Sequence, residues 1–143
     1  MNWNTTDLDK INSLCENTLM KHLGINFVTI NETSLSATMP VNATTHQPMG
    51  LLHGGANAVL IESIASMGSA LLCNLKVEAP VGLEINANHL GSVRTGSVIG
   101  VGKAIHVGKS THVWQVDIFD ESTSKLVCTG RLTVLIKKIN NPK

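Results

Sequence analysis

The sequence predicts an α+β fold in which a single antiparallel sheet packs against one long central helix. A long apolar run at about residues 56–73 follows two glycines and is apolar on nearly every side, as in a buried helix. Four strand-like segments follow it, separated by short polar turns, so neighbouring strands are expected to pair antiparallel. Because the chain has 143 residues, the size of one ordinary domain, we expect a single domain over residues 1–143.

The segments before and after the long helix are predicted from their periodicity. Thr6 and Asp9 have the spacing of a helix start, an apolar stripe follows them, and Gly24 marks the expected end. Residues 25–30 and 35–41 are then expected to form two strands around a polar turn. After the long helix, strands are expected at residues 81–90, 97–107, 111–119 and 126–138, where apolar and polar side chains alternate.

Glu62 is the residue of the long helix that most needs an explanation. From Thr33 to Leu75 it is the only Asp, Glu, Lys or Arg, and ionised carboxylates are rarely buried without a partner. One interpretation places it with Ser66 and Ser69 on a narrow strip that faces solvent. The other, which we favour, is that a cleft holds Glu62 as a nucleophile or general base.

The tripeptide HGG at residues 53–55 lies where the helix should present unpaired N–H groups and the positive end of its dipole. Paired glycines let another group approach the backbone, so the Gly54 N–H can polarise an incoming carbonyl group. A tight turn that merely needs glycine is the alternative. Gln47, just upstream, can add a neutral donor or orient water, and its spacing to Glu62 and Ser66 makes the pattern more specific.

The composition excludes several classes of protein. A net charge of +1 and an aromatic content of 3% provide neither a basic footprint nor a stacking platform for nucleic acid. The long helix contains Asn57 and several serines, with fewer than about 20 apolar residues in a row, so no membrane span is expected. The polar N-terminal residues carry no secretory signal, and Cys15, Cys73 and Cys128 lie far apart, so we expect a cytoplasmic protein with reduced thiols.

Two apparent ligand motifs are rejected. The 6 histidines form no helical i, i+4 pair and join no cysteine cluster, so neither a metal nor another cofactor is expected. Residues 107–111, VGKST, look like the end of a P-loop, but Lys103 stands where its first glycine should be and a strand follows instead of a helix. As a basic turn with free N–H groups this segment could hold a phosphate, and a plain hairpin turn is an equal alternative.

Several stretches resemble the hotdog-fold acyl-CoA thioesterases, in the group related to 4-hydroxybenzoyl-CoA thioesterase and the phenylacetate-degradation thioesterases. They are QPMGLLHGGANAVLIESIAS, VGLEINANHLGSVRTG, ATMPV, HVGKSTHVWQVDIFDE and RLTVLI, and the resemblance covers nearly the whole chain. The resemblance implies a sheet wrapped around one helix, in a homodimer that pairs again into a homotetramer. It also implies a cytoplasmic hydrolase for an aromatic acyl-CoA, such as a hydroxybenzoyl-CoA-like or 1,4-dihydroxy-2-naphthoyl-CoA-like thioester, the latter in menaquinone biosynthesis.

By position, the resemblance also implies the roles of individual residues. Glu62 matches the catalytic carboxylate and Gly54 the backbone donor to the thioester carbonyl. Gln47 and His53 match side chains that position the thioester and the attacking water, and Ser66 matches the hydroxyl one turn beyond the carboxylate. The residues expected to line the CoA channel are Gly82, His89, Leu90, Gly91, Ser92, His106, Val107, Gly108, Lys109, Ser110 and Thr111. CoA is part of the substrate, so no cofactor is implied.

Three departures from the family pattern affect binding rather than chemistry. Met49 stands where Phe is common, residues 109–111 vary a turn that often carries Arg, and Leu90-Gly91 replaces a position that is often basic. Two alternative functions stay open. One is a hotdog hydratase or dehydratase, although no HFPxxP-like loop is found. The other is a non-catalytic acyl-CoA-binding module, which would gain little from an unpaired Glu62.

The helix geometry also predicts how the site is assembled. At 1.5 Å per residue, Gly54 and Glu62 are ~12 Å apart along the helix, whereas both must come within ~3 Å of one thioester carbon. No proline lies inside the run to bend it. We therefore expect two sites per dimer, each made by Glu62 and Ser66 of one subunit with Gln47, His53 and Gly54 of the other.

Overall fold

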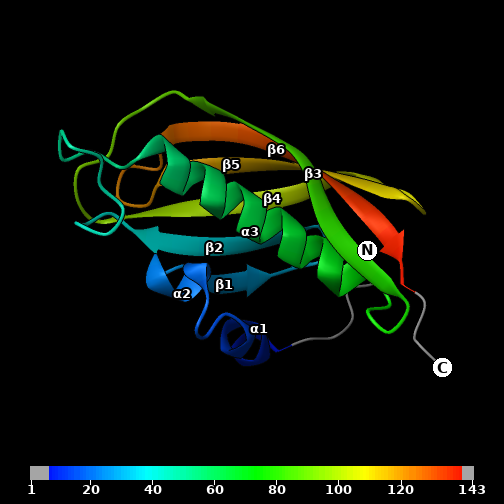
Figure 1. Cartoon of the computed structure of the whole chain (residues 1–143). Coiled ribbons are helices and arrows are strands. Elements are labelled where there is room, and N and C mark those ends of the chain that lie inside the picture. Colours follow the sequence, from blue (N-terminus) through cyan, green and yellow to red (C-terminus); the bar gives the residue numbers. More distant parts are fainter. Residues whose placement is uncertain (1–6, 140–143) are drawn as a thin grey trace.

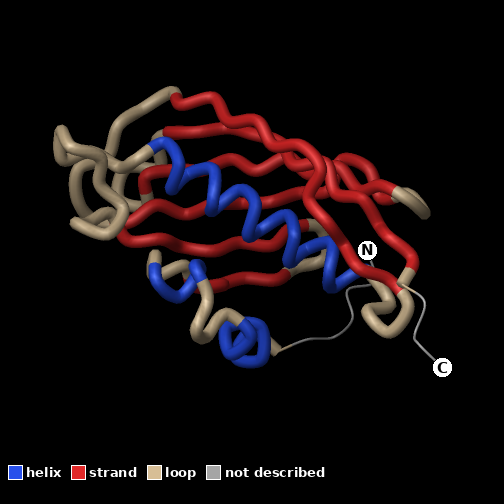
Figure 2. Tube along the Cα trace, viewed as in Figure 1, coloured by secondary structure: helices blue, strands red, loops and turns tan. Residues whose placement is uncertain are grey.

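The computed structural model, which describes residues 7–139, shows an antiparallel sheet that curls around one long helix (Figures 1 and 2). The helix α3 spans Gly54–Leu72, and the six strands follow the order β1-β2-β4-β5-β6-β3, with every neighbouring pair antiparallel. The strands are β1 Asn26–Ile30, β2 Ser34–Pro40, β3 Glu78–His89, β4 Ser97–Val107, β5 Thr111–Asp120 and β6 Leu126–Lys138. The predicted fold class is confirmed, and the predicted ends of β4 and β6 are those observed.

Helix α3 packs its apolar residues against the concave face of the sheet. Leu60, Ile61 and Ile64 are fully buried there. Gly68 lies against the ring of Trp114 on β5, so closely that a β-carbon at this position would overlap the ring. Trp114 Nε1 donates to Ser69 Oγ over 2.9 Å, which satisfies the buried indole N–H. This tight packing fixes the orientation of α3, and its opposite side faces away from the sheet.

The N-terminal segment differs from the prediction. Instead of one helix ending near Gly24, it forms two short helices, α1 Leu8–Leu14 and α2 Leu19–His22. The break lies at Asn17, whose φ of 59° is in the left-handed region, which few residues other than glycine and asparagine adopt. The side chain of Asp7 caps α1, and the predicted cap Thr6 lies outside the described residues.

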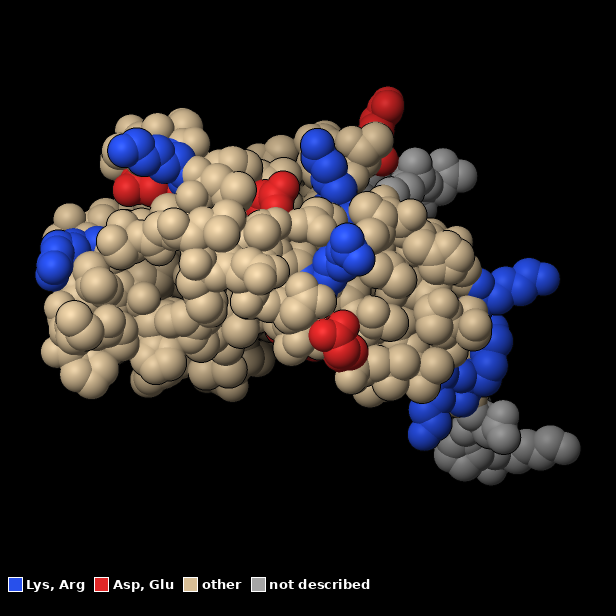
Figure 3. Space-filling view, turned by 90° about the horizontal axis from the view of Figure 1, so that it is seen from above, with Lys and Arg blue, Asp and Glu red and all other residues tan. Residues whose placement is uncertain are grey.

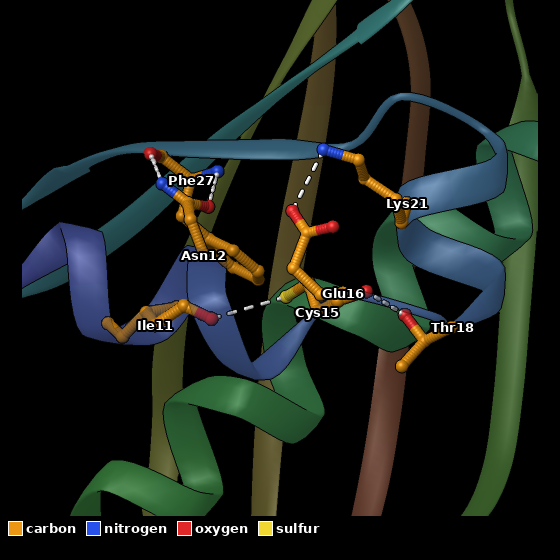
Figure 4. Close-up of polar contacts among 7 residues, drawn as sticks. All are labelled: Ile11, Asn12, Cys15, Glu16, Thr18, Lys21 and Phe27. Atoms are coloured by element: carbon orange, nitrogen blue, oxygen red, sulfur yellow. Dashed lines mark hydrogen bonds and ion pairs between the residues drawn. The ribbon is translucent and has the colours of Figure 1, made fainter.

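Side-chain contacts anchor this segment beside β1 (Figure 4). The amide of Asn12 on α1 bonds both the N–H and the carbonyl of Phe27, at 2.8 and 2.9 Å. Lys21 on α2 forms an ion pair of 2.8 Å with Glu16. Since that pair is exposed, we attribute the docking mainly to the Asn12 bonds and to fully buried Ile11.

Strand β3 forms one edge of the sheet and crosses over the C-terminal half of α3 (Figure 1). It begins at Glu78 rather than at Val81, and within residues 7–139 it pairs with β6 alone. Its side chains Val81, Leu83 and Ile85 are 45%, 58% and 37% exposed. A long edge strand with exposed apolar side chains is a surface for pairing with another strand.

Helix α3 also meets the length and composition of a membrane span. Among the described residues it is the one helix that does so, and half of that stretch is buried inside the fold. The core helix of a soluble protein passes the same test, so this observation is weak evidence for a membrane span. The burial of α3 against the sheet agrees with the prediction that it is a core helix.

Candidate active site

A largely apolar cavity of about 620 Å³ runs along the side of α3 that faces away from the sheet. Helix α2 forms one wall, α3 the floor and β3 the other wall. Its lining residues are Thr18, Leu19, Met20, Ala58, Val59, Glu62, Ser63, Ser66, Met67, Ala70, Pro80 and Ile85. Glu62 is the one charged group among them, so the predicted carboxylate lies in an apolar cavity.

Glu62 is half-buried and holds its carboxylate between α3 and β3. Ser66 Oγ, one turn further along the helix, donates to Glu62 Oε1 over 3.2 Å. On the other side lies Gly82 of β3, where a β-carbon would overlap Oε1 and lie 3.3 Å from Cδ. The ion pairs among residues 7–139 are Lys21–Glu16 and Lys138–Glu78, so no Lys, Arg or His in this range neutralises Glu62 by direct contact.

The interpretation of a solvent-facing strip with Ser66 and Ser69 is wrong for Ser69. Ser69 is fully buried against the sheet and bonds both Trp114 Nε1 and His112 Nδ1, the latter at 3.1 Å. Ser63 is also buried, and its hydroxyl donates to the backbone carbonyl of Val59 over 2.7 Å. Ser66 is therefore the serine of α3 whose hydroxyl group donates a hydrogen bond to Glu62.

The N-terminus of α3 gathers a second set of predicted residues. His53 caps the helix, and its Nδ1 accepts the Gly55 N–H over 2.8 Å. In the neutral ring, this bond leaves the hydrogen on Nε2, which can donate outward. The imidazole of His89, at the end of β3, lies against Gly54, because a β-carbon there would be 2.8 Å from His89 Nε2. Two imidazoles and the Gly54 backbone therefore meet at this helix end.

Gln47 lies half-buried in the loop before α3. The side-chain Oε1 of Gln47 accepts a hydrogen bond from the backbone N–H of Met49. The backbone N–H of Gln47 donates to the Leu51 carbonyl over 2.8 Å. Arg94 Nη1 donates to the Met49 carbonyl over 3.4 Å, and His46 bonds the Arg94 carbonyl at 2.9 Å. These bonds hold the loop against the segment that follows β3, so Gln47 sits on an ordered turn.

The two stretches expected to bind CoA lie at opposite ends of the sheet. His89 pairs with Cys128 on β6, and residues 90–92 continue from that end. The hairpin at residues 106–111 lies near the other end, where the Ser110 carbonyl accepts the Ile136 N–H over 2.8 Å. At 3.3 Å per residue these points are about 26 Å apart along β6. One chain alone therefore does not bring the two stretches into one channel.

Part of the cavity wall could not be predicted from the sequence. Thr18, Leu19 and Met20 of the α2 segment were predicted only as part of an amphipathic helix. Ile85 was predicted only as a strand residue, and Pro80 lies just before the predicted start of that strand. They reach the cavity because of the break at residue 17 and the register of β3, which are long-range features. The hydrogen bond from Ser66 to Glu62 is local, so the i, i+4 spacing could reveal it.

Figure 3 shows one face of the molecule, most of which is uncharged, with basic side chains gathered at its right edge. No basic stripe of the kind that follows a nucleic-acid backbone crosses this face. The charges shown there therefore agree with the exclusion made from the composition.

Comparison with known proteins identifies the class. Residues 49–127 match the family model described as the thioesterase superfamily, so the chain belongs to that family and is a thioester hydrolase. It is 48% identical over 129 residues to 1,4-dihydroxy-2-naphthoyl-CoA hydrolase of Escherichia coli (strain K12), covering 90% of this chain and 93% of that protein. The predicted family and the predicted class of enzyme are both confirmed.

Two further relatives agree. The proofreading thioesterase EntH of Cronobacter turicensis is 40% identical over 129 residues, covering 90% of this chain and 93% of that protein. The crystal structure of a mutant of thioesterase PA1618 from Pseudomonas aeruginosa superposes with a TM-score of 0.94 at 43% identity, covering 97% of this chain and 100% of that one. The likeness therefore extends over nearly the whole chain, including the sheet and the central helix.

Proposed function

We propose that this protein hydrolyses an aromatic acyl-CoA thioester, with Glu62 as the nucleophile or general base. The observation that carries the proposal is a carboxylate that no cation among residues 7–139 contacts, bonded by Ser66, in an apolar cavity of about 620 Å³. That volume lies within the usual range for small-molecule sites. The name of the Escherichia coli relative supports a 1,4-dihydroxy-2-naphthoyl-CoA-like or hydroxybenzoyl-CoA-like substrate, the former in menaquinone biosynthesis.

Two routes fit the same residues. In the nucleophilic route, a Glu62 oxygen bonds to the thioester carbon, the C–S bond breaks, the departing CoA thiolate takes a proton, and water then splits the mixed anhydride. In the general-base route, Glu62 takes a proton from water as the water oxygen bonds to the carbon; the C–S bond then breaks, and the departing CoA thiolate takes that proton. In both, the Gly54 N–H stabilises the developing oxyanion. His53 Nε2 and Gln47 position the thioester and the water, and Ser66 fixes the carboxylate.

A homodimer completes the site in this proposal. Gly54 lies against His89, and Glu62 lies against Gly82. If two β3 strands pair antiparallel about a two-fold axis near residues 84–86, His89 of one subunit lies opposite Gly82 of the partner subunit. Gly54 then comes close to the partner's Glu62, which removes the separation of ~12 Å within one helix.

The same pairing supports a shared CoA channel. Residues 89–92, at the C-terminal end of one β3, approach the N-terminal end of the partner's β3. The partner's hairpin at residues 106–111 lies beside that end. Two such dimers would form the homotetramer expected from the family resemblance. A cytoplasmic location and a reaction without a cofactor remain part of the proposal.

The test is thiol release from purified protein with 1,4-dihydroxy-2-naphthoyl-CoA, benzoyl-CoA, crotonyl-CoA and acetyl-CoA. We expect thiol release, with the highest kcat/KM for the aromatic substrates, because the cavity is apolar and wide. Hydration of crotonyl-CoA without thiol release would instead indicate a hydratase. Binding without turnover of any substrate would indicate a binding module. Equal kcat/KM for acetyl-CoA and benzoyl-CoA would refute the aromatic preference.

A further inference from the structure

We propose that Gly82 is a positioning residue for Glu62, because the absence of a side chain at this point of β3 sets where the carboxylate lies. This inference rests on the proposed function of Glu62. It gives Gly82 a role in the chemical step, beyond the CoA-channel position that the family resemblance suggested.

The contacts of Gly82 are specific to Glu62. A β-carbon at this position would overlap Oε1, lie 3.3 Å from Cδ and lie 3.5 Å from Oε2, and these are the three nearest heavy atoms. Ser66 Oγ donates to the same Oε1 over 3.2 Å from the helix side. One carboxylate oxygen is therefore held between a hydroxyl on α3 and the bare backbone of β3.

The backbone at Gly82 does not itself require glycine. The glycines with φ in the left-handed region are Gly24, Gly50 and Gly96, so an alanine at position 82 would meet no backbone strain. Glycine inside a strand weakens it and commonly marks a close approach of another group. Here the group that approaches is the carboxylate of Glu62.

A β-bulge marks the same point of the strand. Gly82 pairs with Val134 and Glu84 pairs with Thr133, so Leu83 is the extra residue on β3. Bulges are common beside active sites, where they change the direction in which the neighbouring residues point. Together, the bulge and the missing side chain bring the β3 backbone into contact with the carboxylate without crowding it.

These observations predict different effects on stability and on activity for Gly82→Ala. The added methyl group meets the flexible end of Glu62 rather than backbone, so the carboxylate moves and the fold stays. We expect the Tm to be unchanged or higher, since alanine restricts the unfolded chain more than glycine does. We expect kcat to fall about 10- to 100-fold, because a misplacement of about 1 Å has effects of this size. KM should change less than about threefold.

Arg131→Ala is the control. Arg131 lies on β6, opposite Asn86, and lines a separate polar groove with Gln115, away from the free edge of β3. Its truncation should leave kcat within about threefold of wild type. A general loss of sheet stability would reduce both activities together with their Tm values. A normal Tm for both variants, with a loss of kcat only in Gly82→Ala, supports positioning.

Two further measurements connect the effect to the carboxylate. In a double-mutant cycle, Gly82→Ala should reduce kcat much less in a Glu62→Asp background, because the shorter side chain leaves room for the methyl group. A crystal structure of Gly82→Ala should show Glu62 Oε1 displaced from Ser66 Oγ. A kcat within threefold of wild type, or a carboxylate in its original place, overturns the inference.

The inference and the proposed function fail in different ways. If Glu62→Gln keeps its activity, the catalytic role of Glu62 is wrong. If Glu62→Gln is inactive while Gly82→Ala is fully active, only the role of Gly82 is wrong.

Discussion

Mixing two inactive variants tests whether each site is shared between subunits. The perturbation is Glu62→Ala in one preparation and Gln47→Ala in the other. Along α3, Glu62 is ~12 Å from Gly54, and Gln47 lies in the loop that precedes that end of the helix. If the site were within one chain, no combination of these two variants would contain an intact site.

The expected magnitude follows from the two-fold geometry. Random pairing makes half of the dimers mixed, and each mixed dimer holds one intact and one doubly damaged site. About a quarter of the wild-type specific activity should therefore return after co-refolding. Each variant is first shown to be nearly inactive alone, and mixed dimers are verified with a different affinity tag on each chain. If mixed dimers form and thiol release stays at the level of the single variants, the shared site is wrong.

Three further predictions address single residues. Glu62→Gln removes the basic and nucleophilic carboxylate but keeps its shape, so thiol release should fall by at least ~10²–10⁴-fold; more than a tenth of the wild-type rate would contradict this. Ser66→Ala should lower kcat about 10-fold, since hydrogen bonds to charged groups contribute about 1.5–3 kcal/mol. Ser13→Ala is the control, because Ser13 lies on α1 and its hydroxyl donates only to the Lys10 carbonyl; it should change kcat less than about threefold. Burial and, to a smaller extent, the charge of His106 lower the pKa of His112. As the pH falls, His112 therefore takes up its proton in the unfolded chain before it does so in the folded chain. The stability of the fold should consequently decrease as the pH drops below about 6.5. Thermal unfolding of His112→Asn should show a smaller loss of Tm between pH 7.5 and 5.5 than wild type, and equal slopes would contradict the role of His112.

The fold could be predicted because its main elements have strong local patterns. Helix α3 follows from the length of its apolar run. Strand β5 follows from an alternation with a period of 2 residues, in which His112, Trp114, Val116 and Ile118 are the buried positions. The N-terminal helix was predicted incorrectly because its stripe continues past Asn17, and the left-handed backbone at that residue leaves no clear mark in the sequence.

The candidate site also combines contacts that could be predicted from the sequence with contacts that could not. Glu62 and Ser66 are one helical turn apart, so their contact follows from spacing alone. The contact of Gly82 with Glu62 and that of His89 with Gly54 depend on the register of β3 on β6 and on where α3 crosses it. The sequence identified these residues through a family resemblance, but it could not show which of them touch each other.

Strand β3 connects the chemistry of the proposed site with its assembly. One side of its backbone, at Gly82, lies against the carboxylate, and its free edge is the surface proposed to meet the second subunit. The bulge between Gly82 and Glu84 lies close to the two-fold axis inferred for that pairing. A shift of register at the dimer interface would therefore move both the partner's Gly54 and the support of Glu62 at the same time. For this reason, substitutions on the exposed edge, such as at Leu83, should affect kcat even though they touch no substrate.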